Sequence, residues 1–124
     1  MNYNIVQLLM GAFILFIGLI FKFFPPKSIN DLYGYRTVLS MKNLETWRKG
    51  NEISAKILIK GSLIIIFLKI ICICFMPELA VFNTIIFLVG LIAMSILCVF
   101  LTQRKLKKAL IRMVINTKLG LTRI

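Results

Sequence analysis

A segment that begins at the paired prolines Pro25 and Pro26 gathers the side chains best suited to recognising another molecule. Arginine offers a planar fork of N–H donors that suits a carboxylate, a phosphate or a backbone carbonyl. Asparagine offers donors and acceptors together, and tyrosine and tryptophan supply rigid amphipathic area typical of binding hot spots. The candidate binding or structural residues are Asn30, Tyr33, Gly34, Tyr35, Arg36, Thr37, Ser40, Met41, Lys42, Asn43, Trp47 and Asn51. They could bind a partner or organise the chain's own helices, and both alternatives stay open.

Catalysis is not expected from this sequence. Histidine is absent, which removes the commonest general base and the commonest zinc ligand. The acidic residues, which all lie outside the hydrophobic runs, are Asp31, Glu45, Glu52 and Glu78. The cysteines Cys72, Cys74 and Cys98 lie inside those runs, where free cysteine behaves as a small hydrophobe. We therefore expect a protein that acts by binding, with no catalytic residue, no metal site and no cofactor.

The composition indicates a membrane protein. The chain has 124 residues, is 60% hydrophobic and carries a formal net charge of +12, and its mean hydropathy is +0.94. An ordinary soluble domain is only about 45–50% apolar. Direct nucleic-acid binding is not expected, because the basic residues flank hydrophobic runs and no DNA-binding motif is present. The sequence predicts a single membrane domain with basic flanks.

Three hydrophobic runs are each long enough to cross a bilayer, which takes about 20 residues. The first has no lysine or arginine before it and no cleavage site after it, so we interpret it as a retained helix rather than a signal peptide. The paired prolines end this helix. The predicted segments are spans at about 4–24, 57–76 and 79–101, a motif segment at 25–56 and a tail at 102–124. We predict an all-α integral membrane protein whose second and third spans form an antiparallel hairpin.

Two helical segments are expected outside the spans. Ser40 is predicted to cap an interfacial helix that starts at Met41 and runs into the second span. The tail is amphipathic, with basic residues opposite one apolar face. That face holds Leu106, Ala109, Leu110, Met113 and Val114. This pattern suits a membrane surface, and its charge suits anionic lipids.

The basic residues predict the orientation in the membrane. Residues 25–60 contain seven lysines and arginines, and the tail contains seven more. The N-terminal MNYN and the turn at Pro77 and Glu78 contain none. By the positive-inside rule, we expect the N-terminus outside and the motif segment and C-terminus in the cytoplasm.

Lys69 is an intramembrane polar candidate. It lies near the middle of the second span, where a charged side chain is costly and often marks function. No span holds an acidic partner, and Gln7, Asn83 and Thr84 are predicted nearer the outer face. A functional role and a tolerated lysine that extends toward the interface are the two interpretations.

Small residues recur at helical spacing in two spans. Gly11 and Gly18 share a face of the first span, and Gly90 and Ala93 share a face of the third. Because small residues let helices approach closely, we expect both pairs at helix–helix contacts.

The order of the motif residues resembles the SdpI family of bacterial membrane proteins. The paired prolines fit the family's usual lead-in to its motif. Two positions depart from the pattern, with Val38 in place of a proline and Gly50 in place of an alanine. The matching positions are Ile29-Asn30, Tyr33–Thr37, Ser40–Asn43, Trp47 and Asn51.

The resemblance implies a short, three-span member in the bacterial cell membrane. The family is named for an immunity protein that protects a toxin-producing cell and signals to its own repressor. It therefore implies toxin immunity or membrane-based signal transduction through binding, with a peptide toxin or a cytoplasmic regulator as partner. A homo-oligomer is compatible with this interpretation. The alternative function is a small transporter or an accessory subunit of a membrane complex.

Overall fold

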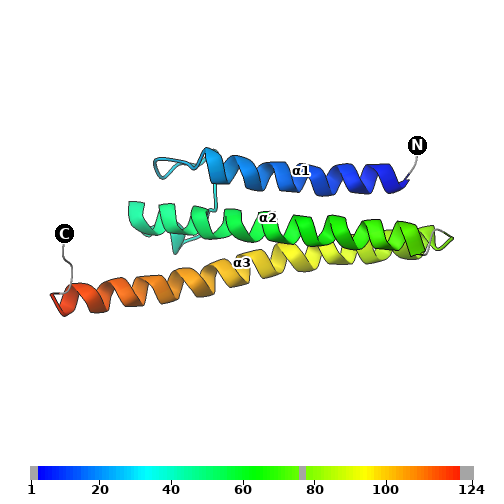
Figure 1. Ribbon diagram of the computed structural model, residues 1–124. Coiled ribbons are helices and arrows are strands. Elements are labelled where there is room, and N and C mark those ends of the chain that lie inside the picture. The colour runs from blue at the N-terminus through cyan, green and yellow to red at the C-terminus, as the bar shows by residue number, and fades with distance from the viewer. Residues whose placement is uncertain (1–2, 76–77, 121–124) are drawn as a thin grey trace.

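The computed structural model describes residues 3–75 and 78–120, and the regular secondary structure within them is entirely helical. Its elements are α1 (Tyr3–Phe23), the short 3-10 helix η1 (Ser40–Lys42), α2 (Leu44–Phe75) and α3 (Ala80–Lys118). Figure 1 shows the three long helices side by side, with α2 between α1 and α3. All three are long and apolar enough to cross a membrane. The predicted fold class is confirmed.

The helix lengths define two ends of the bundle. The 21 residues of α1 rise about 31 Å, close to the thickness of a bilayer's hydrocarbon core. With 32 and 39 residues, α2 and α3 rise about 48 and 58 Å, so both exceed one span. We call the end where α1 stops and α2 begins the loop end, and the opposite end the turn end (Figure 1). The last part of α3 extends at the loop end.

Large apolar side chains cover the outside of the spans. Phe13 and Phe16 of α1, Phe67 of α2 and Ile92 of α3 are all more than half exposed. In water this much exposed apolar surface would be a liability, whereas lipid chains cover it without cost. The arrangement is that of a multi-pass membrane protein.

The contact between α1 and α2 depends on the predicted glycine pair. Gly11 and Gly18 are both buried. A Cβ atom at Gly11 would lie 2.8 Å from Cγ1 of Ile66, and one at Gly18 would lie 3.2 Å from the backbone nitrogen of Ile59. The expectation of close helix packing at these two residues is confirmed.

The second small-residue pair does not lie at a close contact. A Cβ atom at Gly90 would meet nothing within 4 Å, and Ala93 is exposed. Gly90 lines a cavity of about 90 Å³ between α2 and α3. The close approach of these helices is made by Gly61 of α2, where a Cβ would lie 2.7 Å from the sulfur of Met94. The prediction for Gly90 and Ala93 was wrong, because helical spacing alone does not say which small residue the neighbouring helix approaches closely.

The start of α2 also differs from the prediction. Ser40 lies within η1, and α2 begins at Leu44 with Asn43 before it. The backbone N–H of Thr46 donates to Oδ1 of Asn43 at 2.8 Å, and the N–H of Asn43 donates to Oγ1 of Thr46 at 3.2 Å. This reciprocal capping box makes Asn43 the cap of α2. From Leu44 the helix continues without a break into the predicted second span.

The predicted tail continues α3 rather than forming a separate helix. No interruption separates residue 101 from residue 102, and α3 ends at Lys118. The first member of the tail's apolar face, Leu106, is only 1% exposed, and its Cδ2 atom lies 3.5 Å from where a Cβ of Gly50 would be. That face therefore begins by packing on α2. Met76, Pro77 and residues 121–124 lie outside the described residues.

We predict that Gly18→Val destabilises the bundle by about 1–3 kcal/mol, because the added methyl groups would meet the backbone of α2. Gly90→Val is the matched control, since the same substitution there adds its methyl groups beside a cavity. Thermal unfolding in detergent measures both. Equal losses of stability in the two variants would contradict the close α1–α2 packing.

Candidate functional site

The predicted motif forms a small core at the loop end, where residues 24–43 (the motif loop) fold onto α2. Trp47 is fully buried, and its indole N–H donates to the backbone oxygen of Pro26 at 3.1 Å. Gly34 has a positive φ of 119°, and a Cβ there would lie 2.7 Å from Oδ1 of Asn51. Glycine suits that position on both counts, the backbone conformation and the space.

The side chain of Asn51 ties the motif loop to α2. It is fully buried, and its Oδ1 accepts the backbone N–H of Tyr35 at 2.6 Å. Its Nδ2 donates to the backbone oxygen of Trp47 at 2.9 Å. One amide therefore supplies both a donor and an acceptor inside a core that excludes water.

Tyr35 connects the motif loop to α3 as well. Its side chain is buried, and its hydroxyl donates to the backbone oxygen of Val99 at 3.2 Å. Burial raises the pKa of the Tyr35 phenol above its ordinary value of 10.0, so the group is a neutral donor at physiological pH. Its contribution to stability is complete below the unfolded-state pKa and is lost as the pH rises through the higher folded-state pKa.

Hydroxyl groups fix the turn that leads into α2. The backbone N–H of Thr37 donates to Oγ of Ser40 at 2.9 Å, and the Ser40 hydroxyl lies 2.8 Å from the backbone oxygen of Tyr35. Oγ1 of Thr46 lies 3.1 Å from the backbone oxygen of Ser40. With Asn43 capping α2, these contacts hold η1 against the helix.

The first half of the motif loop folds against the end of α1. Oδ1 of Asn30 accepts the backbone N–H groups of Leu32 and Tyr33 at 3.0 and 3.1 Å, which is an Asx-type turn. The ring of Tyr33 lies 6.2 Å from that of Phe21, and its hydroxyl lies 3.4 Å from the backbone oxygen of Phe24.

The motif residues that remain on the surface are Tyr33, Arg36, Lys42 and Asn43. Arg36 is exposed, and its Nη1 donates to the backbone oxygen of Asp31 at 2.5 Å. Lys42 is exposed too, and Met41 is half-buried. Of the twelve predicted residues, the structure buries Tyr35, Ser40, Trp47 and Asn51 at the loop end. Among the exposed ones, Arg36 and Lys42 are the cations available to a partner.

Two further residues complete the core although they were not among the predicted site residues. Pro26 accepts the Trp47 hydrogen bond, and Thr46 closes the capping box. The Asn-x-x-Thr spacing from residue 43 could have indicated the cap, since it places reciprocal hydrogen-bonding groups at the helix start.

Gly50 and Val38, the two departures from the family pattern, have different settings. A Cβ at Gly50 would lie 3.1 Å from Cβ of Ser40 and 3.3 Å from Cδ1 of Tyr35. An alanine there would therefore require the motif loop to shift by a few tenths of an ångström. Val38 is 95% exposed, so its identity matters little for packing.

The intramembrane candidate Lys69 lies inside the bundle. It is 3% exposed, and its Nζ has no hydrogen-bond partner among the described residues. It lines the cavity of about 90 Å³ between α2 and α3, together with Asn83 and mostly apolar side chains. Near the turn end, Nε2 of Gln7 donates to Oγ1 of Thr84 at 2.8 Å and joins α1 to α3. Because its Nζ is enclosed by the bundle, Lys69 does not extend to the interface.

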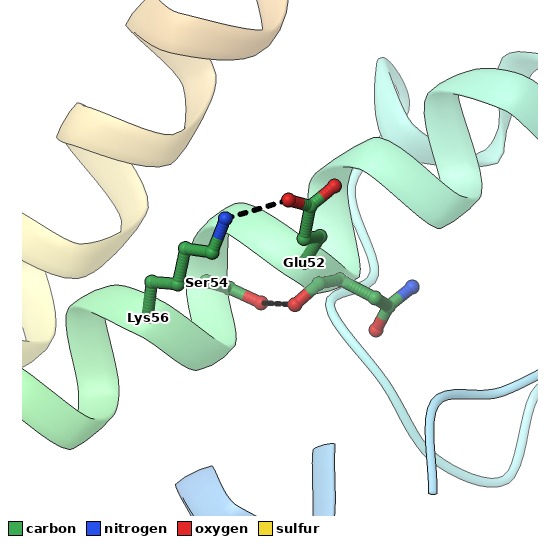
Figure 2. Close-up of polar contacts among 4 residues, drawn as sticks. Glu52, Ser54 and Lys56 are labelled. Carbon is green, nitrogen blue, oxygen red and sulfur yellow. Dashed lines mark hydrogen bonds and ion pairs between the residues drawn. The ribbon is translucent and has the colours of Figure 1, made fainter. Parts of the chain in front are cut away.

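The segment of α2 that follows Asn51 carries an ion pair on its exposed side. Figure 2 shows Lys56 joined to Glu52, with an Nζ–Oε1 distance of 2.6 Å. Ser54 is buried, and its hydroxyl donates to the backbone oxygen of Asn51 at 3.1 Å. This part of α2 therefore presents charge outward and small polar groups inward.

Comparison with known proteins defines the class to which this fold and motif belong. A model of the SdpI/YfhL protein family matches residues 27–102, which include most of the motif loop, all of α2 and the first part of α3. The chain belongs to this family, as the order of its motif residues predicted.

A curated relative supports the same assignment. The chain is 35% identical over 97 residues to the uncharacterized protein YfhL of Bacillus subtilis (strain 168). The matched region covers 78% of this chain and 82% of the relative. No solved structure matches the chain significantly.

We predict that Asn51→Leu destabilises the protein by about 1–3 kcal/mol, because it leaves the buried backbone N–H of Tyr35 without an acceptor. Asn30→Ala is the control, since it removes an asparagine from an exposed turn and should cost less than about 1 kcal/mol. Thermal unfolding in detergent measures both. If the two variants lose the same stability, the hydrogen bonds of Asn51 do not hold the motif loop against α2.

Proposed function

We propose that this protein protects a bacterial cell against a membrane-active peptide toxin, acting by binding rather than by catalysis. The observation that carries the proposal is membership of the SdpI/YfhL family together with the family motif, folded into a fixed core. In this proposal the apolar helices bind the toxin, because they present a large exposed surface to a peptide in the bilayer. The exposed part of the motif loop binds a cytoplasmic regulator.

The proposed orientation places the loop end in the cytoplasm. The basic residues of the motif loop and of the first half of α2 lie toward that end, as does the last part of α3, which is also basic (Figure 1). At the turn end the described charged side chain is the acidic Glu78. This asymmetry supports an outside N-terminus and a cytoplasmic C-terminus under the positive-inside rule.

Arg36 is the residue we propose for partner contact at the loop end. Its guanidinium is exposed on a loop whose backbone is fixed by Asn51 and Ser40. A preorganised arginine loses little freedom on binding a carboxylate or a carbonyl. Lys42 adds a second exposed cation nearby in sequence.

The proposal predicts that cells expressing this protein survive a peptide toxin that kills the parent strain, and that Arg36→Ala lowers survival by about tenfold or more, the loss expected for one charged contact. Survival counts after exposure to a panel of membrane-active bacterial peptides measure this.

Lys105→Ala is the matched control, because it also removes one exposed cation but does so from α3, outside the motif. Expression of each variant is compared by immunoblot of membranes. Absence of protection against every peptide would overturn the immunity function. Equal effects of the two variants would show that the motif contributes only charge.

The second candidate function, a small transporter or an accessory subunit, is favoured by Lys69. Coupled transport commonly uses an ionisable residue within the membrane, and this one borders a cavity between two spans. Three spans make a pathway only when several copies assemble.

Lys69→Met separates the two candidates. Removing a buried amine that has no hydrogen-bond partner should leave stability unchanged or raise it by about 1–3 kcal/mol, and toxin protection should persist. Thermal unfolding and the survival assay measure the two effects. A more stable variant that no longer protects would favour transport, and a strongly destabilised one would show that Nζ has a stabilising partner.

A further inference from the structure

A groove of about 480 Å³ lies where the end of α1 faces the first half of α2. We propose that this groove binds the anionic headgroup of a glycerophospholipid, with the phosphate among its cations and the acyl chains along the spans. The inference concerns a lipid site and holds whether or not the protein confers toxin immunity.

The depth of the groove in the membrane suits a headgroup. It includes Phe21 and Lys22 from the last turn of α1, followed by Pro25 and Lys27. The length of α1 matches one hydrocarbon core, so its last turn lies where lipid chains meet headgroups. The neighbouring Phe23 and Phe24 are 66% and 71% exposed, which suits aromatic rings at that level.

The charge of the groove suits an anion. Its cations come from two elements: Lys22 and Lys27 from the α1 side, and Arg48 and Lys56 from α2. Its one carboxylate, Glu52, is paired with Lys56 at 2.6 Å (Figure 2). Within residues 3–75 and 78–120, that pair is the only salt bridge. The other three cations of the groove are therefore not neutralised by a carboxylate and can pair with an anionic ligand. An arginine fork beside lysines is a common arrangement for phosphate recognition.

The walls of the groove favour a lipid over a free phosphate ion. Phe21, Pro25 and Ala55 give it apolar sides next to the cations. A free ion would use only the charges, whereas a phospholipid would use the charges for its phosphate and the apolar sides for its glycerol and first methylenes. Basic pockets between membrane helices are known to hold anionic headgroups in this way.

The site is distinct from the basic part of α3. Lys107 and Lys108 lie on α3 and do not line the groove. They supply a diffuse surface charge, whereas the groove brings cations from two elements to one concave place. Variants that remove two cations from the groove can therefore be compared with variants that remove two cations from α3, since both lower the net charge equally.

The test uses the full chain, purified in neutral detergent and stripped of lipid. Phosphatidylglycerol, but not phosphatidylcholine, should bind with about one lipid per chain in native mass spectrometry and raise Tm. Lys27→Gln combined with Arg48→Gln should weaken the apparent Kd by about thirtyfold, since each cation near a membrane surface accounts for roughly fivefold.

Lys107→Gln combined with Lys108→Gln is the matched control, and its apparent Kd should change by less than about twofold. Lys27→Arg combined with Arg48→Lys keeps the charge and should retain binding, which guards against a folding defect. Equal losses in the groove and control variants would overturn the site, as would equal binding of phosphatidylcholine. An equal rise in Tm with inorganic phosphate alone would replace the lipid with a free-ion site.

Discussion

The structure at the loop end depends on one side-chain amide, that of Asn51. A loop that folds onto a helix beside a membrane must satisfy its buried backbone groups without help from water. Asn51 does this for the N–H of Tyr35, and its Nδ2 adds a second hydrogen bond to the carbonyl of Trp47 within α2. The glycine at position 34 follows from the same constraint, because any larger residue would meet the Asn51 oxygen. The indole N–H of Trp47 donates to the backbone oxygen of Pro26, and this hydrogen bond fixes the path of the chain after α1.

This arrangement explains why a short hydrophobic protein carries such a polar segment. Most hydroxyl, amide and aromatic groups of the motif loop make contacts within the protein. Tyr35 connects the loop to α3 through its hydrogen bond to Val99. The motif thereby sets the relative positions of the three spans at one membrane surface. The groups that it leaves for other molecules are the exposed side chains of Tyr33, Arg36 and Lys42, and the basic groove beside α1. Binding functions fit this division, since a rigid frame presents a few cations at fixed positions.

The sequence predicted the features that follow from hydropathy, charge and residue order. It predicted three spans because hydrophobic runs of this length have few alternatives, and it predicted the family because the order of residues 29–51 is specific. It could not say that Tyr35 turns inward and Arg36 outward, because both residue types are common in cores and at binding surfaces. It placed the helix cap at Ser40, whereas Asn43 caps α2 in the structure. Ser40 does not act as the cap because its hydroxyl bonds the backbone of Thr37 and Tyr35, a contact between loop residues that the sequence does not reveal. It also assigned Gly90 to a close helix contact, although α2 leaves a cavity beside Gly90 and makes its close approach at Gly61 instead.

The central claim is that Asn51 fixes the motif loop to α2. The most direct measurement is hydrogen exchange of the Tyr35 backbone amide in the purified protein, followed by NMR. The account predicts that this amide exchanges as slowly as the amides in the middle of α2, because its hydrogen bond breaks only when the core opens. Exchange as fast as that of an unprotected loop amide would contradict it, and the motif would then be a mobile segment rather than the frame of the loop end.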